Sequence, residues 1–307
     1  MVHSADKLPL CAHFWRGAHD RSGTDLTATA PRRRPPTSRL LPLEEAIGSL
    51  LNDGDSVAFE GFTHLIPFAA GQEAIRQGKK DLELVRMTPD LIYDQMIGAG
   101  CARRLVFSYG GNPGVGSLHR LRDAVENQWP APLELEEHSH AGMVNRYIAG
   151  ASGLPFAVLR GYAGTDLPDH SEVGEVTCPF TGEVLSAVPA LRPDLTVIHA
   201  QQADRQGNVQ LWGIPGVQKE AVLSAARSLV TVEEIVDELT LQPGGVIIPS
   251  WEIDAVSHVP NGAQPSYTHG YTTRDNDFYR EWDEISRSRE AFGEWLDRLT
   301  AGEGDES

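Results

Sequence analysis

Short apolar segments alternate with amphipathic ones along most of this chain, and no other feature constrains the fold as strongly. Apolar runs at 56–59 and 82–85 are each followed by a segment with helical spacing. Repeated strand–helix units place helices against a mainly parallel sheet whose strands are apolar on both faces. The sequence therefore predicts an α/β fold, an open and mainly parallel sheet flanked by helices.

The remaining elements follow from the same periodicities. Further strands are expected at 105–107, 133–136, 156–160, 195–200, 228–232, 245–248 and 253–259. Helices are expected near 43–51, 70–78, 90–98, 117–126, 139–150, 216–226 and 277–299.

The two ends of the chain differ from the patterned region. Residues 1–40 hold seven basic and three acidic residues and no apolar run that could serve as a signal sequence. We expect 1–40 to be a disordered extension, 41–300 to be the α/β domain, and 301–307 to be a solvated acidic tail.

Charge and cysteine content exclude several classes of protein. The formal net charge of −17 argues against nucleic-acid binding, and no stretch approaches the roughly 20 apolar residues of a membrane helix. An anionic substrate would need a local cationic pocket. The three cysteines are widely spaced, which favours a reducing cytoplasm over a disulfide scaffold, and Cys101 and Cys178 are expected to be ordinary buried residues.

The turn after the strand at 56–59 is the first candidate site. It reads Glu60-Gly61-Phe62-Thr63-His64 and continues to a proline at position 67. Ligands of parallel sheets bind at the carboxyl ends of strands, and a glycine there allows close approach of a ligand. A tight turn that binds nothing is an equally good reading.

A glycine-rich loop at 108–116 is the second candidate. It contains Gly110, Gly111 and Asn112 between a strand and a helix, but it lacks the G-x-G-x-x-G spacing and the Walker lysine. This excludes a Rossmann or P-loop site. The loop could line a pocket for an acyl or pantetheine group, or it could be only a flexible turn.

Other polar clusters carry weaker signals. Gln201 and Gln202 end a buried strand, where they could orient a carbonyl or simply satisfy backbone groups. The pair Glu233–Glu234 reads as a solvated strand end. His138 and His140 would share one side of a strand, but their spacing does not fit a metal site, and we expect no metal.

The order of these motifs resembles the A (alpha) subunits of two-subunit family I coenzyme A transferases, over about residues 41–300. The family signature has an Asp, an apolar run, Gly-Gly-Phe and a later Pro; here it stands at 55–62 and 67, with Glu60 in place of the first glycine. Glutaconate CoA-transferase alpha subunits look similar at 198–203, 212–213, 262–266 and 275–276. The branch whose acceptor is 3-oxoadipate looks closer still, at 60–67, 86–91, 110–116, 119–126, 137–140 and 178–182.

The resemblance implies a ping-pong transfer of CoA from succinyl-CoA to a 3-oxo dicarboxylic acid, most closely 3-oxoadipate. In this family the nucleophilic glutamate lies on the B subunit, so the chain would carry no catalytic residue and would act in a hetero-oligomer with that partner. Glu60 is the rival nucleophile within the chain. CoA esters would be substrates, and no cofactor is expected.

The chain would contribute substrate-binding residues, namely Gly61, Phe62, Thr63, His64, Gly110, Gly111 and Asn112. His64, Arg86 or Arg120 could supply positive charge for a dicarboxylate. Three alternatives stay open: the alpha chain of a glutaconate CoA-transferase, part of a CoA-ester ring-opening hydrolase on the same scaffold, and a non-catalytic CoA-ester-binding protein.

Overall fold

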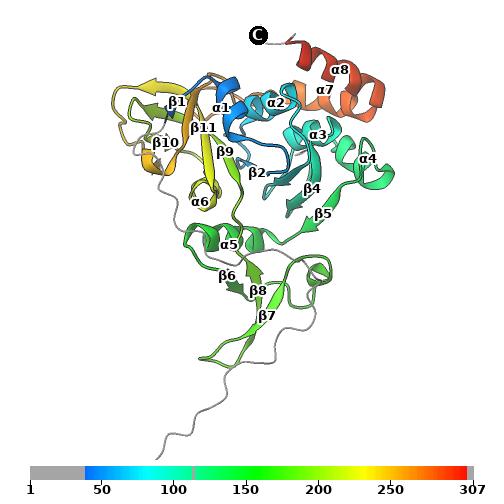
Figure 1. The fold of residues 1–307 in the computed structure, drawn as a ribbon, viewed down its shortest axis with the longest axis vertical. Coiled ribbons are helices and arrows are strands. Elements are labelled where there is room, and N and C mark those ends of the chain that lie inside the picture. Colours follow the sequence, from blue (N-terminus) through cyan, green and yellow to red (C-terminus); the bar gives the residue numbers. More distant parts are fainter. Residues whose placement is uncertain (1–38, 113–114, 303–307) are drawn as a thin grey trace, which may run out of the picture. The chain divides into compact units, whose positions relative to one another are not determined.

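A ten-stranded sheet forms the centre of the part of the chain that the computed structural model describes, residues 39–112 and 115–302. Eight of its strands run parallel in the order β1-β13-β11-β9-β2-β3-β4-β5 (Figure 1). Their bounds are β1 Arg39–Leu40, β2 Ser56–Glu60, β3 Leu82–Val85, β4 Ala102–Phe107, β5 Glu134–Glu137, β9 Leu195–Asp204, β11 Arg227–Val236 and β13 Ala255–His258. The predicted fold class, an open and mainly parallel sheet flanked by helices, is confirmed.

The direction in which the strands are added reverses between β2 and β9. From β2 the chain adds β3, β4 and β5 on one side, whereas β9, β11 and β13 extend the sheet on the other. Phe59 of β2 pairs with Val197 of β9 at this point. Loops diverge where the strand order reverses, and the crevice they leave at the carboxyl ends is the usual binding place in such sheets.

Helices cover both faces of the sheet (Figure 1). One layer consists of α1 Leu43–Leu50, α2 Phe68–Arg76, α3 Leu91–Gly98, α4 His119–Asn127, α7 Asn276–Arg287 and α8 Arg289–Ala301. The other consists of α5 His140–Ala151 and α6 Gln218–Ser224. Each layer buries its own apolar cluster against the strands.

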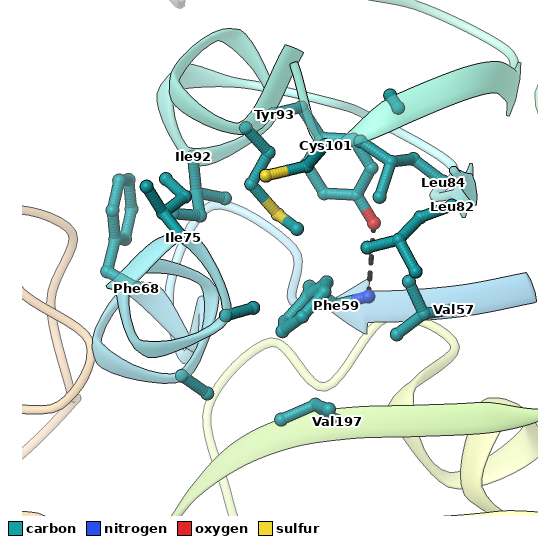
Figure 2. Packing of buried hydrophobic residues seen from close by; sticks show 14 of the residues in the cluster. Val57, Phe59, Phe68, Ile75, Leu82, Leu84, Ile92, Tyr93, Cys101 and Val197 are labelled. Carbon is teal, nitrogen blue, oxygen red and sulfur yellow. Dashed lines mark hydrogen bonds between the residues drawn. The ribbon is translucent and has the colours of Figure 1, made fainter. Parts of the chain in front are cut away.

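A tyrosine hydroxyl joins two neighbouring strands within the larger of these clusters. Tyr93 of α3 accepts a 3.0 Å hydrogen bond from the backbone N–H of Phe59 (Figure 2) and donates a 2.6 Å bond to the carbonyl of Val85. The hydroxyl is therefore satisfied although it is packed among apolar side chains such as Val57 and Leu84. Apolar burial and these bonds together fix the ends of β2 and β3 next to the candidate site.

A small antiparallel sheet follows α5. It has the order β6-β8-β7, from β6 Phe156–Leu159, β7 Gly174–Thr177 and β8 Val184–Pro189, with a 3-10 turn at Leu167–Asp169. Two further strands, β10 Val209–Leu211 and β12 Val246–Ile248, extend the main sheet in antiparallel fashion, and a 3-10 turn lies at Ser250–Glu252. The strands β7, β8 and β10 carry too little apolar periodicity to be predicted.

Several sequence predictions need correction. The single helix expected at 277–299 is two helices, because Ser288 ends α7 and its hydroxyl caps α8 by accepting a bond from the N–H of Ala291. Cys101 is buried as expected, but Cys178 is half-exposed in the turn between β7 and β8.

The predicted ends of the chain are largely outside the described residues. Arg39–Leu40 pair with β13, so the sheet begins inside the segment expected to be an extension. Residues 1–38, which include Cys11, and 303–307 lie outside the described part. In the described ranges, no helix combines the length and the apolar character needed to cross a bilayer.

Candidate functional site

A pocket of about 150 Å³ lies where β2, β3 and β4 end. Three loops that follow these strands form its walls, and the segment that leads into α7 closes it. The lining residues are Phe62, Thr63, Ile66, Arg86, Thr88, Pro89, Asp90, Tyr109, Gly111, Arg274 and Tyr279. Both loops that the sequence singled out therefore reach one pocket.

The loop after β2 owes its shape to a glycine. A Cβ atom on Gly61 would lie 2.6 Å from the carbonyl oxygen of Leu65 and 2.8 Å from the Cα of Ile66, so no larger residue fits. Thr63 and Leu65 adopt left-handed conformations, with φ of 62° and 54°. Non-glycine residues in that region indicate a backbone held by its surroundings.

A buried ion pair forms one side of the pocket. Arg86 donates a 2.8 Å hydrogen bond to the carboxylate of Asp90 and a 2.9 Å bond to the carbonyl of Gly61. Burial alone would lower the pKa of Arg86, but Asp90 and other nearby groups raise it, so the guanidinium stays charged. Arg86 thereby fixes the loop at Gly61 against the loop after β3.

Glu60 lies beneath the pocket and does not line it. Its side chain is 2% exposed, and one carboxylate oxygen accepts bonds from the Tyr147 hydroxyl at 2.8 Å and from the N–H of Met87 at 3.0 Å. Burial raises the pKa of Glu60, whereas Arg86 and these hydrogen bonds oppose the rise. In this position the carboxylate joins β2, β3 and α5.

His64 is not among the residues that line the pocket. Its ring is fully buried, accepts a 2.8 Å bond from the N–H of Ile214 and stacks on Tyr267 at 5.0 Å. Burial lowers the pKa of His64 to about 4, so the ring is neutral near pH 7. The prediction that His64 could supply positive charge is wrong, although a contact with substrate through its backbone stays a prediction.

Arg120 does not reach the pocket either. It lies on α4, donates a 3.0 Å bond to Asp123 and covers the ring of Trp129 at 5.1 Å. Of the three cations that the sequence offered, Arg86 alone is among the pocket residues.

The glycine-rich loop contributes to the pocket in part. Gly111 lines it, whereas Asn112 is buried and donates a 3.1 Å bond to the carbonyl of Tyr279, which joins the loop to α7. Gly110 lies next to the lining residue Tyr109. Residues 113 and 114 lie outside the described part of the chain.

Arg274 and Tyr279 were missed by the sequence reasoning. Both come from the far end of the chain, where only the neighbouring pair at 275–276 drew notice by resemblance. Their contribution depends on the path of the chain after β13, which periodicity does not reveal. Asp275, whose side chain accepts bonds from the N–H groups of Asp277 and Phe278, was an available signal for the start of α7.

Glu233 and Gln201, to which the sequence assigned only weak signals, both belong to buried hydrogen-bond networks. Glu233 was expected to be solvated, but it is 6% exposed and accepts bonds from His199 at 3.0 Å and Thr268 at 2.6 Å. Its neighbour Glu234 does lie at the surface, where Tyr271 donates to it. The Gln201 side chain donates hydrogen bonds to the backbone carbonyls of Trp212 and His269, so it satisfies backbone groups.

The two histidines near β5 do not share a strand face. His138 is buried and lies 2.6 Å from the carboxylate of Glu136, whereas His140 is the first residue of α5. Within residues 39–112 and 115–302, no group of three or more His, Cys, Asp or Glu side chains is placed to hold a metal ion.

Known proteins resemble this chain in sequence and in fold. Residues 41–258 match the family model described as Coenzyme A transferase. The A (alpha) chain of the 3-oxoadipate CoA-transferase of Pseudomonas knackmussii is 64% identical over 269 residues, which cover 87% of this chain and 95% of that protein.

Two solved structures share the fold. The glutaconate coenzyme A-transferase of Acidaminococcus fermentans has a TM-score of 0.78 at 29% identity and covers 86% of this chain and 89% of its own. A variant of the decarboxylase AibA/AibB has a TM-score of 0.75 at 30% identity and covers 86% and 100%. A family match over more than half of the chain, together with the relative at 64% identity, shows that this chain belongs to the coenzyme A transferase family.

Proposed function

We propose that this chain is the alpha subunit of a two-subunit CoA-transferase that moves CoA from succinyl-CoA to 3-oxoadipate. The sequence identity to the alpha subunit of a 3-oxoadipate CoA-transferase, over nearly the full length of that protein, supports the substrate pair. The pocket at the carboxyl ends of β2, β3 and β4 supports a role in substrate binding. CoA esters are the substrates, and the proposal includes no resident cofactor.

One observation supports the proposal that the two chains have different roles in catalysis. Asp90 provides the single carboxylate among the described pocket residues, and Arg86 holds it in an ion pair at 2.8 Å. Glu60 is buried below the pocket and already accepts two hydrogen bonds. The described lining therefore offers no unengaged carboxylate, which supports the family arrangement in which the nucleophilic glutamate belongs to the B subunit.

The reaction then follows the family's sequence of steps. The B subunit provides the carboxylate oxygen that attacks the thioester carbon of succinyl-CoA, which forms an acyl-glutamyl anhydride and releases the CoA thiolate. The thiolate attacks the glutamyl carbon and releases succinate, which leaves CoA on the enzyme as a thioester. The carboxylate of 3-oxoadipate repeats the two steps in reverse and regenerates the free glutamate.

Negative charge develops on the carbonyl oxygen in each attack. Backbone N–H groups of the Gly61–Thr63 turn lie at the carboxyl end of β2, where they could stabilise this charge. The neutral ring of His64 cannot do so as a cation.

The test compares this chain alone, the isolated B subunit, and the two together, with succinyl-CoA and 3-oxoadipate. We expect transfer only from the complex. Borohydride reduction of the enzyme–CoA thioester, followed by peptide mapping, should mark a glutamate of the B subunit. The Glu60→Gln variant, in complex, should keep more than a tenth of the activity, because in this proposal Glu60 is not the nucleophile. Loss of a nucleophile lowers activity far more than tenfold, so the two roles are easily distinguished.

Five results would contradict the proposal in whole or in part. Normal turnover by this chain alone, or a label on Glu60, would place the nucleophile here. Strong preference for glutaconate or acetoacetate would change the acceptor. A product in which CoA remains attached to an opened ring would instead identify a hydrolase on this scaffold, and binding of CoA esters without turnover by the complex would identify a non-catalytic binding protein.

A further inference from the structure

The charged side chains of the pocket are already engaged within the protein. Arg86 forms its ion pair with Asp90 at 2.8 Å. Arg274 lies over the ring of Tyr279, with its Cζ atom 3.9 Å from the ring centre, and its charge also favours the ionised form of Asp90. The hydroxyl of Tyr279 has Ser266 as a hydrogen-bond partner. These contacts hold the walls of the pocket in place.

Three hydroxyl groups of the lining have no hydrogen-bond partner within the described part of the chain. They belong to Thr63, Thr88 and Tyr109. Thr63 and Tyr109 are exposed, so bulk water can satisfy their hydroxyls, whereas Thr88 is half-buried. A hydroxyl carries no charge and can donate one hydrogen bond. Such a group suits an uncharged acceptor, such as the oxygen of a ketone, because no unpaired charge has to be buried.

Thr88 lies between two residues whose backbones are fixed. Both backbone groups of Met87 are hydrogen-bonded, and its carbonyl accepts the hydroxyl of Ser108 at 2.6 Å. The carbonyl of Pro89 accepts the N–H of Gly111 at 3.1 Å. A short side chain on a segment held at both ends loses little freedom when a ligand binds, so Thr88 is a preorganised donor.

The exposure of the lining residues separates the mouth of the pocket from its floor. Tyr109 is 56% exposed, whereas Ile66 and Tyr279 are buried, and the half-buried Thr88 is intermediate. The volume of about 150 Å³ is similar to that of an engineered cavity that holds benzene, so the pocket fits a short carbon chain. The reacting carbon must lie toward the mouth to meet a nucleophile from another subunit. In a 3-oxo acid the ketone carbon lies two positions further along the chain, and therefore deeper.

We infer that the Thr88 hydroxyl donates a hydrogen bond to the ketone oxygen of the 3-oxo acid and so favours this acceptor over acids that lack the ketone. This inference rests on the proposed function, because it requires that 3-oxoadipate occupies the pocket. Succinyl-CoA has a methylene group at its third carbon and gains nothing from this bond. Thr88 therefore acts in the half of the ping-pong reaction in which the 3-oxo acid binds.

A two-substrate kinetic series with the complete complex separates the two halves. In a ping-pong reaction, kcat/KM for each substrate reports only the half-reaction in which that substrate takes part. Thr88→Val removes the hydroxyl and keeps the shape, so it should lower kcat/KM for 3-oxoadipate about tenfold, the loss expected for one neutral hydrogen bond. The value for succinyl-CoA from the same series should change less than about twofold.

Three further variants identify the group that is responsible. Thr88→Ser keeps the hydroxyl and should recover most of the loss on 3-oxoadipate. Tyr109→Phe removes a rival hydroxyl at the mouth and should cost less on 3-oxoadipate than Thr88→Val does. Thr177→Val is the matched control, because Thr177 is exposed at the end of β7 and does not line the pocket. It should leave kcat/KM for both substrates unchanged.

The possible results are distinct. An equal loss on both substrates in Thr88→Val would mean that Thr88 serves only the structure. An unchanged value for 3-oxoadipate, or a larger loss in Tyr109→Phe, would place the donor elsewhere. Each of these results overturns the inference, whereas a wild-type complex that transfers no CoA from succinyl-CoA to 3-oxoadipate would contradict the proposed function itself.

Discussion

The hydroxyl of Tyr147 on α5 donates a 2.8 Å hydrogen bond to Glu60 at the carboxyl end of β2. The same carboxylate oxygen accepts the N–H of Met87, the second residue after β3. A single buried oxygen therefore joins one helix layer to two central strands directly below the pocket. This arrangement gives Glu60 a positioning role and explains why a charged residue is tolerated there.

Removing this hydroxyl should destabilise the protein. In Tyr147→Phe the buried Glu60 loses a donor, and we expect the free energy of unfolding in urea to fall by about 1–2 kcal/mol. Tyr271→Phe is the matched control: Tyr271 donates to Glu234 at the same 2.8 Å distance, but at the surface. It should cost less than about 0.5 kcal/mol, and equal costs in the two variants would contradict the positioning role.

Two glycine-to-alanine changes should have opposite effects. Gly61→Ala places its Cβ 2.6 Å from a backbone oxygen, so we expect a loss of about 2–4 kcal/mol in stability and a collapse of transferase activity in the complex. Gly293→Ala, in α8, meets no atom within 4 Å and should raise stability by about 0.5–1 kcal/mol. Melting curves of both variants provide the check, and a stable, active Gly61→Ala would refute the account of the loop.

Acid should weaken the network around Glu136. Burial would raise the pKa of this carboxyl, but His138, Arg146 and Arg104 outweigh burial and lower the pKa to about 2. Because the pKa is depressed in the folded state, the resulting stabilisation is present above the normal pKa of 4.5 and is lost as the pH falls from about 5 toward 2.

The corresponding variant is Glu136→Gln. Its amide cannot balance Arg104 and Arg146, and we expect a loss of about 3–5 kcal/mol at pH 7 that shrinks toward pH 3. Glu126→Gln removes an exposed pair with Arg122 on α4 and should cost less than about 0.5 kcal/mol at every pH. Urea titrations from pH 3 to 7 measure both, and a difference between the two variants that does not change with pH would count against the assignment.

Trp282 should be the most sensitive aromatic residue in the C-terminal helices. It is fully buried, packs edge to face with Trp295 at 4.8 Å and donates a 3.0 Å bond to Asp94. Trp282→Phe leaves a cavity and removes one donor from a buried carboxylate, which should cost about 2–4 kcal/mol. Trp251 is 60% exposed, so Trp251→Phe should be nearly neutral in the same denaturant series.

The parallel sheet was predictable because strands buried on both faces are continuous runs of apolar residues, which any hydropathy scale detects. The strands at 56–60 and 82–85 and the helices that follow them lie within a few residues of their predicted positions. The small sheet was not predictable in full, because β7 is mostly exposed and its residues Gly174 and Glu175 are poor strand formers. Likewise, the stripe of aromatic residues at 278–296 continues across the break at Ser288 and so suggested one helix.

The candidate site was predictable on one side only. Phe62, Thr63 and Gly111 follow strands in a sheet whose topology dictates where ligands bind. For His64 and Glu233 the outcome depends on burial, which lowers the pKa of His64 and encloses Glu233. The degree of burial of a single polar side chain cannot be predicted from the order of residues. Arg274 reaches the pocket only through the path of a long loop, which local patterns do not encode.

The pocket joins an early part of the chain to a late one, since Phe62 and Tyr279 line the same space. During synthesis on the ribosome, β2, β3 and β4 emerge long before the segment that completes the wall. A nascent or prematurely terminated polypeptide that stops near residue 260 could form much of the sheet, but it would have an open trough in place of the pocket. Completion of the C-terminal helices therefore decides whether a newly released polypeptide has a closed pocket.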